Sequence, residues 1–565
     1  MSQSIAALKA VISGLTQPGG QFEMEDTQIN GIQYKSFKNA PVTLTEIYQT
    51  SVTAFGDAPF LVYQDETYSF REVFELSQKL SASLVQQGVK KGDRVAIAMR
   101  NCPEWVIAFM AVTSAGAIAV ALNSWGEADE LEYGLTDSGA SLAFLDGRRL
   151  DLLSDKLSDL GVQAVAVRVE GKLPENVLSW NQLLDSTVAE QAVEISTDDS
   201  AYIMYTSGTT GRPKGALTSH RAAGQAVMCG SMAGMMVASQ HPKTVEKLIA
   251  RAKPTAIMLS LPLFHGSGLL TVIFSALKNG TKVVMQPRWD PEDALKLIEK
   301  EGVGTLSGAA KMIWDLLEHP EFDKYDTSSI FNMTGVGAAQ PETLVKDILT
   351  AFPDNFAGTG YGMTECNMFA TLNTGPTYLE NKDSVGLPYP VTEIKIVDDQ
   401  GKELPVGEVG EICIKGPTLV DGYWGKEEAT GETIVGGWLH GGDIGYLGEN
   451  GLVYVCDRKK DVVIRGGENI YCVEVEAIIN AHTGVDECAV FGVPHERWGE
   501  ELAVTLRLKQ DSDLSENALK EHVSRHLAKF KVPAYVDIAS EPLPRNAMQK
   551  VLKHEVRRQY LEKLA

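Results

Sequence analysis

Two series of short apolar runs constrain the fold of this chain more than any other feature. One series lies between about residues 56 and 200, and the other between about 201 and 375. Segments with helical periodicity separate the runs, and this alternation is typical of βαβ units on mostly parallel sheets. The runs are RVAIAM (94–99), AIAVALN (117–123), SLAFLD (141–146) and QAVAVRV (163–169), then AYIMYTS, TAIMLSLPLF, TKVVMQP and FNMTGVG.

The pattern changes after about residue 380. Short strands divided by DDQG and PVG turns predict a small antiparallel, β-barrel-like subdomain at about residues 380–457. The polar stretch DRKKD (457–461) precedes a tail with its own strands and helices, in which residues 487–508 predict two strands joined by a turn. Because 565 residues exceed one ordinary core, we expect at least two domains, and the alternating runs predict the α/β class. The protein would have a large N-terminal domain of two βαβ-type sheets plus the β-subdomain, followed by a small α+β domain.

Charge and cysteine content exclude several classes of protein. The chain has 51 lysines and arginines against 74 acidic residues, so its charge of −23 argues against non-specific nucleic-acid binding. None of its seven cysteines forms a CxxC pair, which favours a reducing, cytoplasmic compartment and argues against a zinc site. The uncharged segment 105–126 is long enough to span a bilayer. Pro103 marks a helix start and Gly116 a helix end, however, so we expect a buried helix, then a strand, and no transmembrane segment.

The stretch YTSGTTGRPKGA (205–216) places glycines, hydroxyls and two cations in one turn after an apolar strand. In open α/β sheets, ligands bind at the carboxyl ends of strands. Gly208, Gly211 and Gly215 allow a tight turn that directs backbone N–H groups toward an anion, and Lys214 adds a mobile positive charge. The hydroxyl donors are Thr206, Ser207, Thr209 and Thr210. The stretch therefore predicts a phosphate-binding loop.

Two other phosphate motifs do not fit this chain. A Walker A loop has GxxxxGK followed by Ser or Thr, whereas here Pro213 precedes Lys214 and Gly215 follows it. The run GTGYGM (358–363) is similar to a dinucleotide fingerprint, but Met363 stands where the third glycine is required.

Six further motifs follow the loop in a characteristic order. They are LPLFHGSG (261–268), GYGMTE (360–365), GEICIKGPTLVDGYW (410–424), GWLHGGDIGY (437–446), DRKKDVVIRGGENIYCVEVE (457–476) and PRNAMQK (544–550). With them the chain resembles the adenylate-forming (AMP-binding) enzymes over about residues 60–555, and within that superfamily the acyl-CoA synthetases. The resemblance implies that a carboxylic acid reacts with ATP to give acyl-AMP and pyrophosphate, and that the acyl group then passes to a thiol.

The resemblance also implies an ATP site. The loop with Lys214 would hold the β- and γ-phosphates, Tyr361 would stack on adenine, and Asp443 with Arg458 would hold the ribose. The implied ATP-binding residues are Thr206, Ser207, Gly208, Thr209, Thr210, Gly211, Lys214, Gly337, Ala338, Ala339, Gly360, Tyr361, Gly362, Met363, Thr364, Asp443, Arg458 and Lys550. Glu365 would bind Mg²⁺, a hard cation that prefers oxygen ligands, and Thr206 would support the ion through phosphate or water.

Three of the residues that match family motifs are implied in catalysis. Lys550 would bridge the acid's carboxylate, the α-phosphate and the ribose, and Thr364 would contact the α-phosphate. His265 would gate an acyl pocket, whose implied lining is His265, Gly266, Gly335 and Gly337. The chain departs from the family at Gln549, where glycine is usual, and at Gly441, where threonine is commoner.

The thiol-transfer step in the family needs a domain rotation. The resemblance implies a large domain of residues 1–457, a hinge at 458–461 with Asp461 as pivot, and a mobile small domain of residues 462–565 that carries Lys550. After rotation, Gly466, Gly467 and Glu468 would contact coenzyme A. Small residues suit a narrow path for its pantetheine arm.

The identity of the acid is left open by the sequence. FHGSG lacks the aspartate that amino-acid-activating members use, and the motifs are most similar to those of enzymes for medium- or long-chain fatty acids. The methionine-rich segment 225–238 is either an adaptable pocket lining or a core helix. The alternatives are a ligase that loads a carrier protein or uses an aryl acid, and a non-catalytic nucleotide-binding relative. The expected partners are the acid, ATP and coenzyme A, and a homodimer is compatible with these features.

Overall fold

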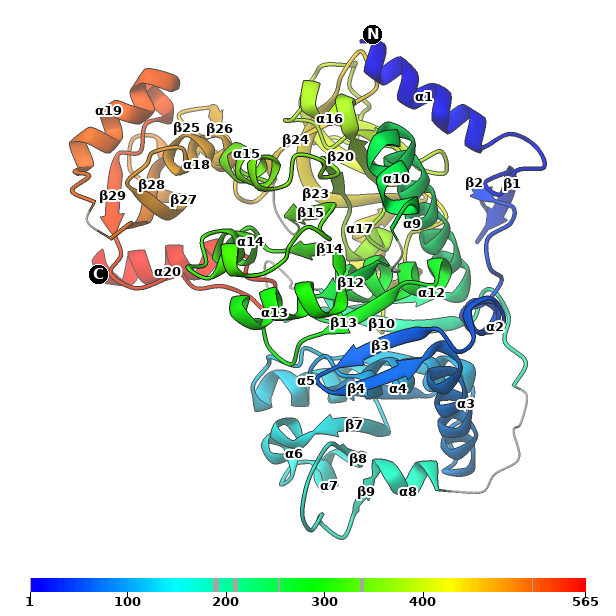
Figure 1. Ribbon diagram of the computed structural model, residues 1–565. Coiled ribbons are helices and arrows are strands. Elements are labelled where there is room, and N and C mark those ends of the chain that lie inside the picture. Colours follow the sequence, from blue (N-terminus) through cyan, green and yellow to red (C-terminus); the bar gives the residue numbers. More distant parts are fainter. Residues whose placement is uncertain are drawn as a thin grey trace.

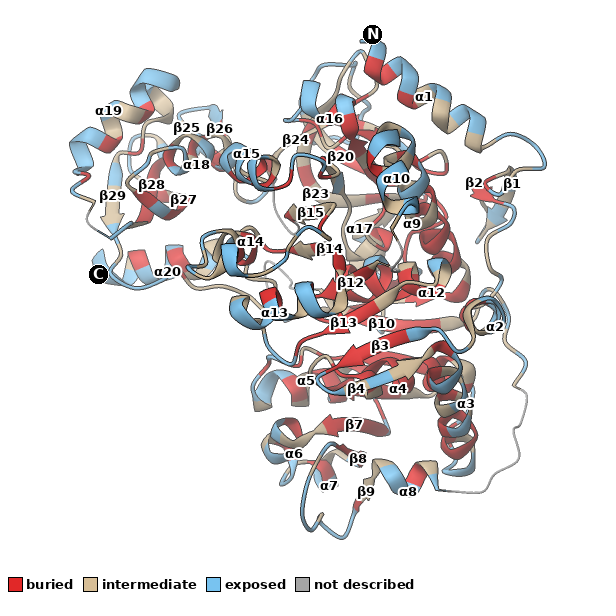
Figure 2. Cartoon of the chain, viewed as in Figure 1, coloured by how far each residue is buried: buried red, intermediate tan, exposed pale blue. Residues whose placement is uncertain are grey.

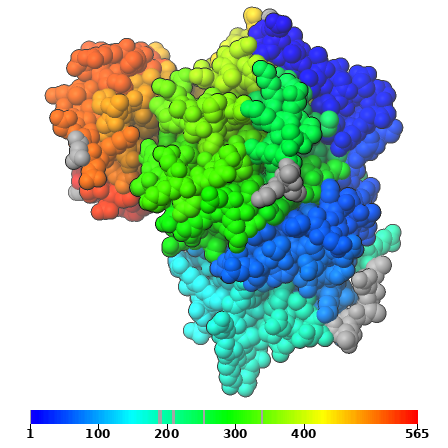
Figure 3. Space-filling view, in the orientation of Figure 1, coloured from blue at the N-terminus to red at the C-terminus, as the bar shows by residue number. Residues whose placement is uncertain are grey.

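A computed structural model describes residues 2–185, 193–206, 212–251, 255–335, 340–510 and 512–564. Figure 1 shows a large body built from the first four-fifths of the chain and a smaller lobe, orange to red, beside it. In the space-filling view the lobe lies against the green surface of the large body (Figure 3).

The first predicted series of runs forms an eight-stranded sheet, which also takes in the run AYIMYTS of the second series as β10. Its strand order is β21-β11-β10-β6-β5-β7-β8-β9, and the strands from β10 to β9 are parallel. β11 and β21 extend it in antiparallel pairing. The strands are β5 (Arg94–Ala98), β6 (Ile118–Ala121), β7 (Leu142–Asp146), β8 (Gln163–Val167), β9 (Val177–Ser179), β10 (Ser200–Thr206), β11 (Lys214–Ser219) and β21 (Gly422–Tyr423).

The rest of the second series forms a six-stranded sheet with β3 and β4, which come from an earlier part of the chain. Its order is β15-β14-β12-β13-β3-β4, and it is parallel except for the β3–β4 pair. The strands are β3 (Pro59–Tyr63), β4 (Glu66–Ser69), β12 (Ala256–Leu259), β13 (Lys282–Met285), β14 (Val303–Gly308) and β15 (Asn332–Gly335). Both sheets therefore agree with the predicted α/β class.

Helices cover the faces of the two sheets, and the buried residues, drawn red, concentrate in the sheets and in the helix faces against them (Figure 2). The helices of the large body are α1 (Gln3–Leu15), α2 (Leu44–Phe55), α3 (Phe70–Gln86), α4 (Pro103–Ser114), α5 (Ala128–Ser138), α6 (Gly147–Leu153), α7 (Leu157–Leu160), α8 (Trp180–Leu184), α9 (His220–Gln240), α10 (Pro242–Ile249), α11 (Gly266–Gly268), η1 (Leu269–Phe274), α12 (Ser275–Asn279), α13 (Pro291–Glu301), α14 (Ala310–Leu317), η2 (Phe322–Lys324), α15 (Glu342–Ala351), η3 (Thr364–Cys366), α16 (Gly375–Glu380) and α17 (Glu427–Thr433). A hairpin of β1 (Met24–Ile29) and β2 (Ile32–Phe37) follows α1.

Helix α4 accounts for the uncharged segment. Proline at its first position starts it, and it passes at Gly116 (φ +70°) into β6, as predicted. Trp105 and Phe109 are fully buried in one core cluster with side chains of both large sheets. Because this helix is surrounded by protein, it is apolar on every face. Within the described residues, no helix is long and apolar enough to cross a membrane.

A β-rich region follows the second sheet. A three-stranded sheet contains β16 (Gly358–Tyr361), β17 (Thr371–Thr374) and β18 (Leu387–Pro388). A five-stranded antiparallel sheet contains β19 (Glu393–Val397), β20 (Gly410–Lys415), β22 (Ile434–Val435), β23 (Trp438–Leu447) and β24 (Val453–Arg458). It occupies the range predicted for the antiparallel subdomain.

The smaller lobe has its own sheet and its own core. Its strands are β25 (Val463–Arg465), β26 (Glu468–Ile470), β27 (Val485–His495), β28 (Gly499–Leu508) and β29 (Tyr535–Ile538), and its helices are α18 (Cys472–Asn480), α19 (Glu516–His526), η4 (Lys529–Lys531) and α20 (Lys553–Leu564). The predicted pair of strands is β27–β28. All seven cysteines are described, and none is in a disulfide.

Candidate active site

The predicted phosphate loop connects the carboxyl end of β10 to the start of β11 in the eight-stranded sheet. Ser207, Gly208, Thr209, Thr210 and Gly211 lie outside the described residues. The two ends of the loop are described: Thr206 is the ladder partner of Lys214, and its hydroxyl donates to the Lys214 carbonyl at 3.4 Å.

The lysine of this loop lies beside the predicted magnesium ligand. Lys214 Nζ is 4.8 Å from the centroid of the Tyr423 ring, and the Tyr423 hydroxyl donates to Glu365 Oε1 at 2.7 Å. The short strand β21 makes this possible, because it pairs with β11 and sets Tyr423 opposite Ala216. One tyrosine therefore contacts both the cation and the carboxylate.

The GYGMTE motif is a tight turn between β16 and η3. A Cβ at Gly362 would lie 2.1 Å from the carbonyl oxygen of Met368, so only glycine fits there. A Cβ at Gly360 would lie 3.3 Å from the Thr371 carbonyl oxygen. The turn delivers Thr364 and Glu365 at the start of η3.

A hydrogen bond and an ion pair join Tyr361, Asp443 and Arg458 in one cluster. The Tyr361 hydroxyl donates to Asp443 Oδ2 at 2.7 Å, and Arg458 Nε lies 2.8 Å from Asp443 Oδ1. Adjacent strands produce this arrangement, because Asp443 of β23 is the ladder partner of Arg458 of β24. Burial raises the pKa of Asp443, while Arg458 and the Tyr361 hydrogen bond oppose the rise. Each carboxylate oxygen keeps a second lone pair that could accept a sugar hydroxyl.

The departure at Gly441 has a local explanation. A Cβ at this position would lie 2.5 Å from Met363 Cε and 2.6 Å from its sulfur. The methionine side chain therefore fills the space that a larger residue 441 would need.

Lys550 approaches the Asp443 cluster from the smaller lobe. Lys550 is exposed at the surface, yet partial desolvation of its ammonium lowers the pKa, the charge of Arg458 lowers it further, and Asp443 and Asp461 act in the opposite direction. The neighbouring Ala547 packs against the core of the large body, and the Ser267 hydroxyl is 3.9 Å from Met548 Sδ. The motifs that contain Ser267, Asp443 and Lys550 lie far apart in the chain and thus meet at one place.

The predicted acyl-pocket residues follow β12 and end β15. Burial lowers the pKa of His265 to about 4, so its ring is neutral at pH 7. A Cβ at Gly266 would lie 2.7 Å from Met368 Cγ, and one at Gly335 would lie 3.2 Å from Gln340 Cγ. Gly337, Ala338 and Ala339 lie outside the described residues.

The predicted coenzyme A loop makes its described contacts within the smaller lobe. The Gly466 amide donates to the Trp498 carbonyl at 2.8 Å, and both Gly466 and Gly467 have positive φ, +60° and +92°. Glu468 begins β26. Asp461 donates its amide to the Arg458 carbonyl at 2.9 Å, which places a turn at the predicted hinge.

The donor set suits magnesium held partly by substrate. Among the described residues, no group of three or more His, Cys, Asp or Glu side chains could hold a metal ion. Glu365 offers one carboxylate beside the phosphate loop, and Mg²⁺ in nucleotide enzymes is commonly bound by one or two carboxylates plus phosphates. The residues present therefore fit a nucleotide-bound Mg²⁺.

Sequence reasoning missed two residues that order this site. Tyr423 lies in the quoted GEICIKGPTLVDGYW motif, but its contacts depend on the pairing of β21 with β11, which the sequence does not reveal. Arg545 lies in PRNAMQK, and its role depends on a partner in another strand, which the sequence does not reveal.

Comparisons with known proteins identify the family of the chain. The model of the AMP-binding enzyme family matches residues 48–424, and that of the AMP-binding enzyme C-terminal domain matches residues 474–550. The long-chain-fatty-acid–CoA ligase of Salmonella typhimurium is 31% identical over 561 residues, covering 94% of this chain and 95% of that protein. The feruloyl-CoA synthase of an Amycolatopsis species is 32% identical over 495 residues, covering 87% and 94%.

A solved relative has the same fold. The o-succinylbenzoate CoA synthetase of Bacillus subtilis, in complex with its acyl-adenylate intermediate, superposes with a TM-score of 0.76 at 29% identity, covering 90% of this chain and 97% of that one. The resemblance drawn from the motifs is confirmed: the chain belongs to the AMP-binding enzyme family.

Proposed function

We propose that this protein is an ATP-dependent acyl-CoA ligase, which converts a carboxylic acid, ATP and coenzyme A into acyl-CoA, AMP and pyrophosphate through an acyl-adenylate. The observation that carries the proposal is the Tyr361–Asp443–Arg458 cluster, together with the packing of the Lys550 loop against the large body through Ala547 and Met548. Relatives named as a long-chain-fatty-acid–CoA ligase and a feruloyl-CoA synthase support it.

The first step is attack of the acid's carboxylate oxygen on the α-phosphorus of ATP, with pyrophosphate as leaving group. Positioning and charge neutralisation supply most of the catalysis in such transfers. The phosphate loop and Lys214 hold the β- and γ-phosphates, and Thr364 with Lys550 contacts the α-phosphate. Glu365, with Thr206 nearby, would hold Mg²⁺, which neutralises phosphate charge when bound.

The nucleoside end is held by Tyr361, Asp443 and Arg458. The buried aspartate is fixed by its tyrosine and arginine partners, so it can accept ribose hydroxyls without reorientation. The ring of Tyr361 offers a face for adenine. Lys550 neutralises the carboxylate and the α-phosphate as they approach each other.

In the second step the coenzyme A thiol attacks the acyl carbon, and AMP leaves. For this step we propose a rotation at residues 458–461, with Asp461 as pivot, between a large domain of residues 1–457 and a small domain of residues 462–565. Lys550 then withdraws, and Gly466, Gly467 and Glu468 replace it beside the acyl-adenylate.

We propose a medium- or long-chain fatty acid as substrate, gated by the neutral His265. The thioethers of Met368 and Met548 lie beside Gly266 and Ser267, and such flexible side chains suit an apolar chain of variable shape. An aryl acid is the second candidate, because the feruloyl-CoA synthase relative is as similar as the fatty-acid ligases. We also propose cytoplasmic location and a homodimer.

Half-reactions test the proposal. Pyrophosphate exchange into ATP, measured over fatty acids of graded length and aryl acids, should depend on the acid. Overall turnover should need coenzyme A and give AMP. Lys550→Ala should abolish exchange yet largely spare thioester formation from supplied acyl-AMP. Formation of ADP, or equal loss of both half-reactions, would contradict the assigned roles.

A further inference from the structure

We infer that Arg545 is the positioning residue that holds Lys550 in its adenylation geometry, and that it does so by fixing a left-handed backbone at Gln549. This inference rests on the proposed role of Lys550. Gln549 has φ +59°, a region in which side-chain-bearing residues are strained and glycine is not. The chain therefore keeps the backbone shape of the family's glycine without having the glycine.

The loop is the turn of a short hairpin whose strands pair through Arg545 and Val551. Asn546 organises the turn: its Oδ1 accepts the amides of Met548 at 2.9 Å and Lys550 at 3.0 Å. Its backbone carbonyl accepts the Gln549 amide at 2.9 Å. These bonds fix residues on both sides of Gln549 but leave its carbonyl direction to be set by another donor.

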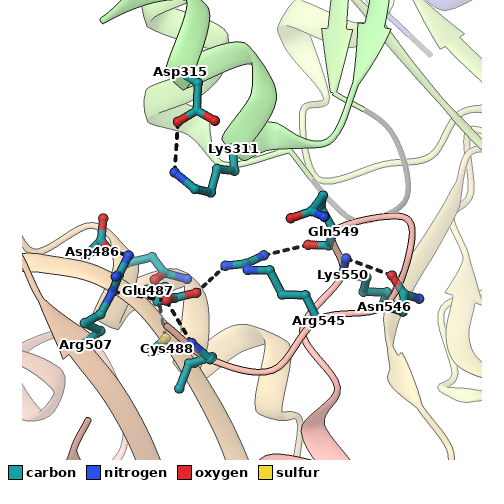
Figure 4. Close-up of polar contacts among 12 residues, drawn as sticks. Lys311, Asp315, Asp486, Glu487, Cys488, Arg507, Arg545, Asn546, Gln549 and Lys550 are labelled. Carbon is teal, nitrogen blue, oxygen red and sulfur yellow. Dashed lines mark hydrogen bonds and ion pairs between the residues drawn. The ribbon is translucent and has the colours of Figure 1, made fainter. Parts of the chain in front are cut away.

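Arg545 supplies that donor. Its Nη1 donates to the Gln549 carbonyl at 2.6 Å, and its Nη2 pairs with the carboxylate of Glu487 (Figure 4). A planar guanidinium donates in two fixed directions at once, so the carbonyl of the strained residue is tied to an acid on β27.

Glu487, the ion-pair partner of Arg545, is itself held in a fixed position. Its side chain is 9% exposed, its Oε1 accepts the Leu543 amide at 3.1 Å, and Arg507 Nε lies 3.2 Å from the same oxygen. The carboxylate is thus held by the start of the hairpin and by β28. Arg545 connects this rigid sheet to the residue directly before Lys550.

The consequence for catalysis is specific to one half-reaction. Without the guanidinium, Gln549 relaxes toward its preferred backbone region, and the peptide that carries Lys550 rotates away from Asp443. Adenylation then slows. Thioester formation, in which Lys550 is withdrawn, is unaffected. A glycine in place of Gln549 would occupy the left-handed region unaided, so it would need Arg545 less.

The test is a double-mutant cycle of Arg545 and Gln549 in the full-length enzyme. It is measured in both half-reactions, adenylation and thioester formation. Arg545→Ala should lower the rate of acid-dependent pyrophosphate exchange about tenfold, the scale of one lost charge-assisted hydrogen bond, and leave thioester formation from supplied acyl-AMP unchanged. In the Gln549→Gly background the same substitution should cost about twofold or less. Arg545→Lys, which keeps the ion pair with Glu487 but not the two-pronged geometry, should fall between.

Arg558→Ala is the matched control, because Arg558 is an ion-paired arginine on exposed α20 of the same lobe. It should change neither half-reaction. Equal loss of both half-reactions in Arg545→Ala, or an equal cost of that substitution in the wild-type and Gln549→Gly backgrounds, would overturn the inference. Lys550→Ala separates the two proposals. If Lys550→Ala keeps full exchange activity, the proposed role of Lys550 fails. If Lys550→Ala loses exchange activity but Arg545→Ala keeps it, only the role of Arg545 is refuted.

Discussion

Tyr423→Phe offers a direct test of how Glu365 is oriented. The substitution removes one hydroxyl and keeps the ring, so the contact between Lys214 and the ring face survives. What is lost is the 2.7 Å hydrogen bond to Glu365 Oε1. We expect the carboxylate to sample more rotamers and to bind Mg²⁺ less well.

The size of the effect follows from the partner's charge. A hydrogen bond to an ionised group contributes about 1.5–3 kcal/mol, and the lower end applies because Glu365 is only partly buried, so water replaces some of the loss. About 1.5 kcal/mol corresponds to roughly a tenfold higher Mg²⁺ concentration for half-maximal exchange. The free energy of unfolding should change by less than about 1 kcal/mol.

The assay is pyrophosphate exchange titrated with MgCl₂ at saturating acid. Tyr68→Phe is the control, because the Tyr68 hydroxyl donates to Glu66 at 3.0 Å in the same kind of pair far from the site. It should leave the Mg²⁺ titration unchanged. An unshifted midpoint in Tyr423→Phe, or an equal shift in the control, would refute this account of Glu365.

Three further outcomes are expected. Gly362→Ala should lose about 3 kcal/mol of stability in thermal unfolding, because its Cβ would lie 2.1 Å from the Met368 carbonyl oxygen. Gly441→Thr should raise KM for ATP about fivefold, and Met363→Ala should restore it, since only the flexible methionine end obstructs the new side chain. Burial lowers the pKa of His220 from 6.5 to about 4, so between these pH values the unfolded chain binds a proton that the folded chain does not. The free energy of unfolding should therefore fall as pH drops from 6.5 toward 4. In urea denaturation, His220→Asn should remove about 3 kcal/mol of this loss.

The sequence predicted the sheets because apolar runs report burial directly. Every run of both series contains a strand of the two large sheets, and Pro103 and Gly116 correctly bounded the buried α4. The N-terminal hairpin β1–β2 was not predicted, because its strands carry mostly polar side chains and only partial burial. The pairing of β21 with β11 could not be predicted from the sequence either, because a strand of two residues shows no hydrophobic periodicity.

The site was predicted residue by residue only where a motif matched. The structure brings Tyr361, Asp443 and Arg458 together with Lys550, while their catalytic roles stay predictions. For the methionine-rich segment, Met228, Met232 and Met236 are buried in the main core and Met235 is 46% exposed, so most of α9 is core helix. Composition could not separate these alternatives, because thioethers suit both environments.

The pairing of β21 with β11 has a consequence for the order of events. It ties the β-rich region to the large sheet by a backbone ladder beside the phosphate loop, so the walls around Lys214, Glu365 and Tyr423 are one continuous hydrogen-bonded unit. In the proposed rotation only the lobe that carries Lys550 would move, and this hydrogen-bonded unit would stay fixed. ATP and the acid would therefore bind before the lobe closes over them. Coenzyme A would reach the acyl-adenylate only after the lobe has rotated to its second position.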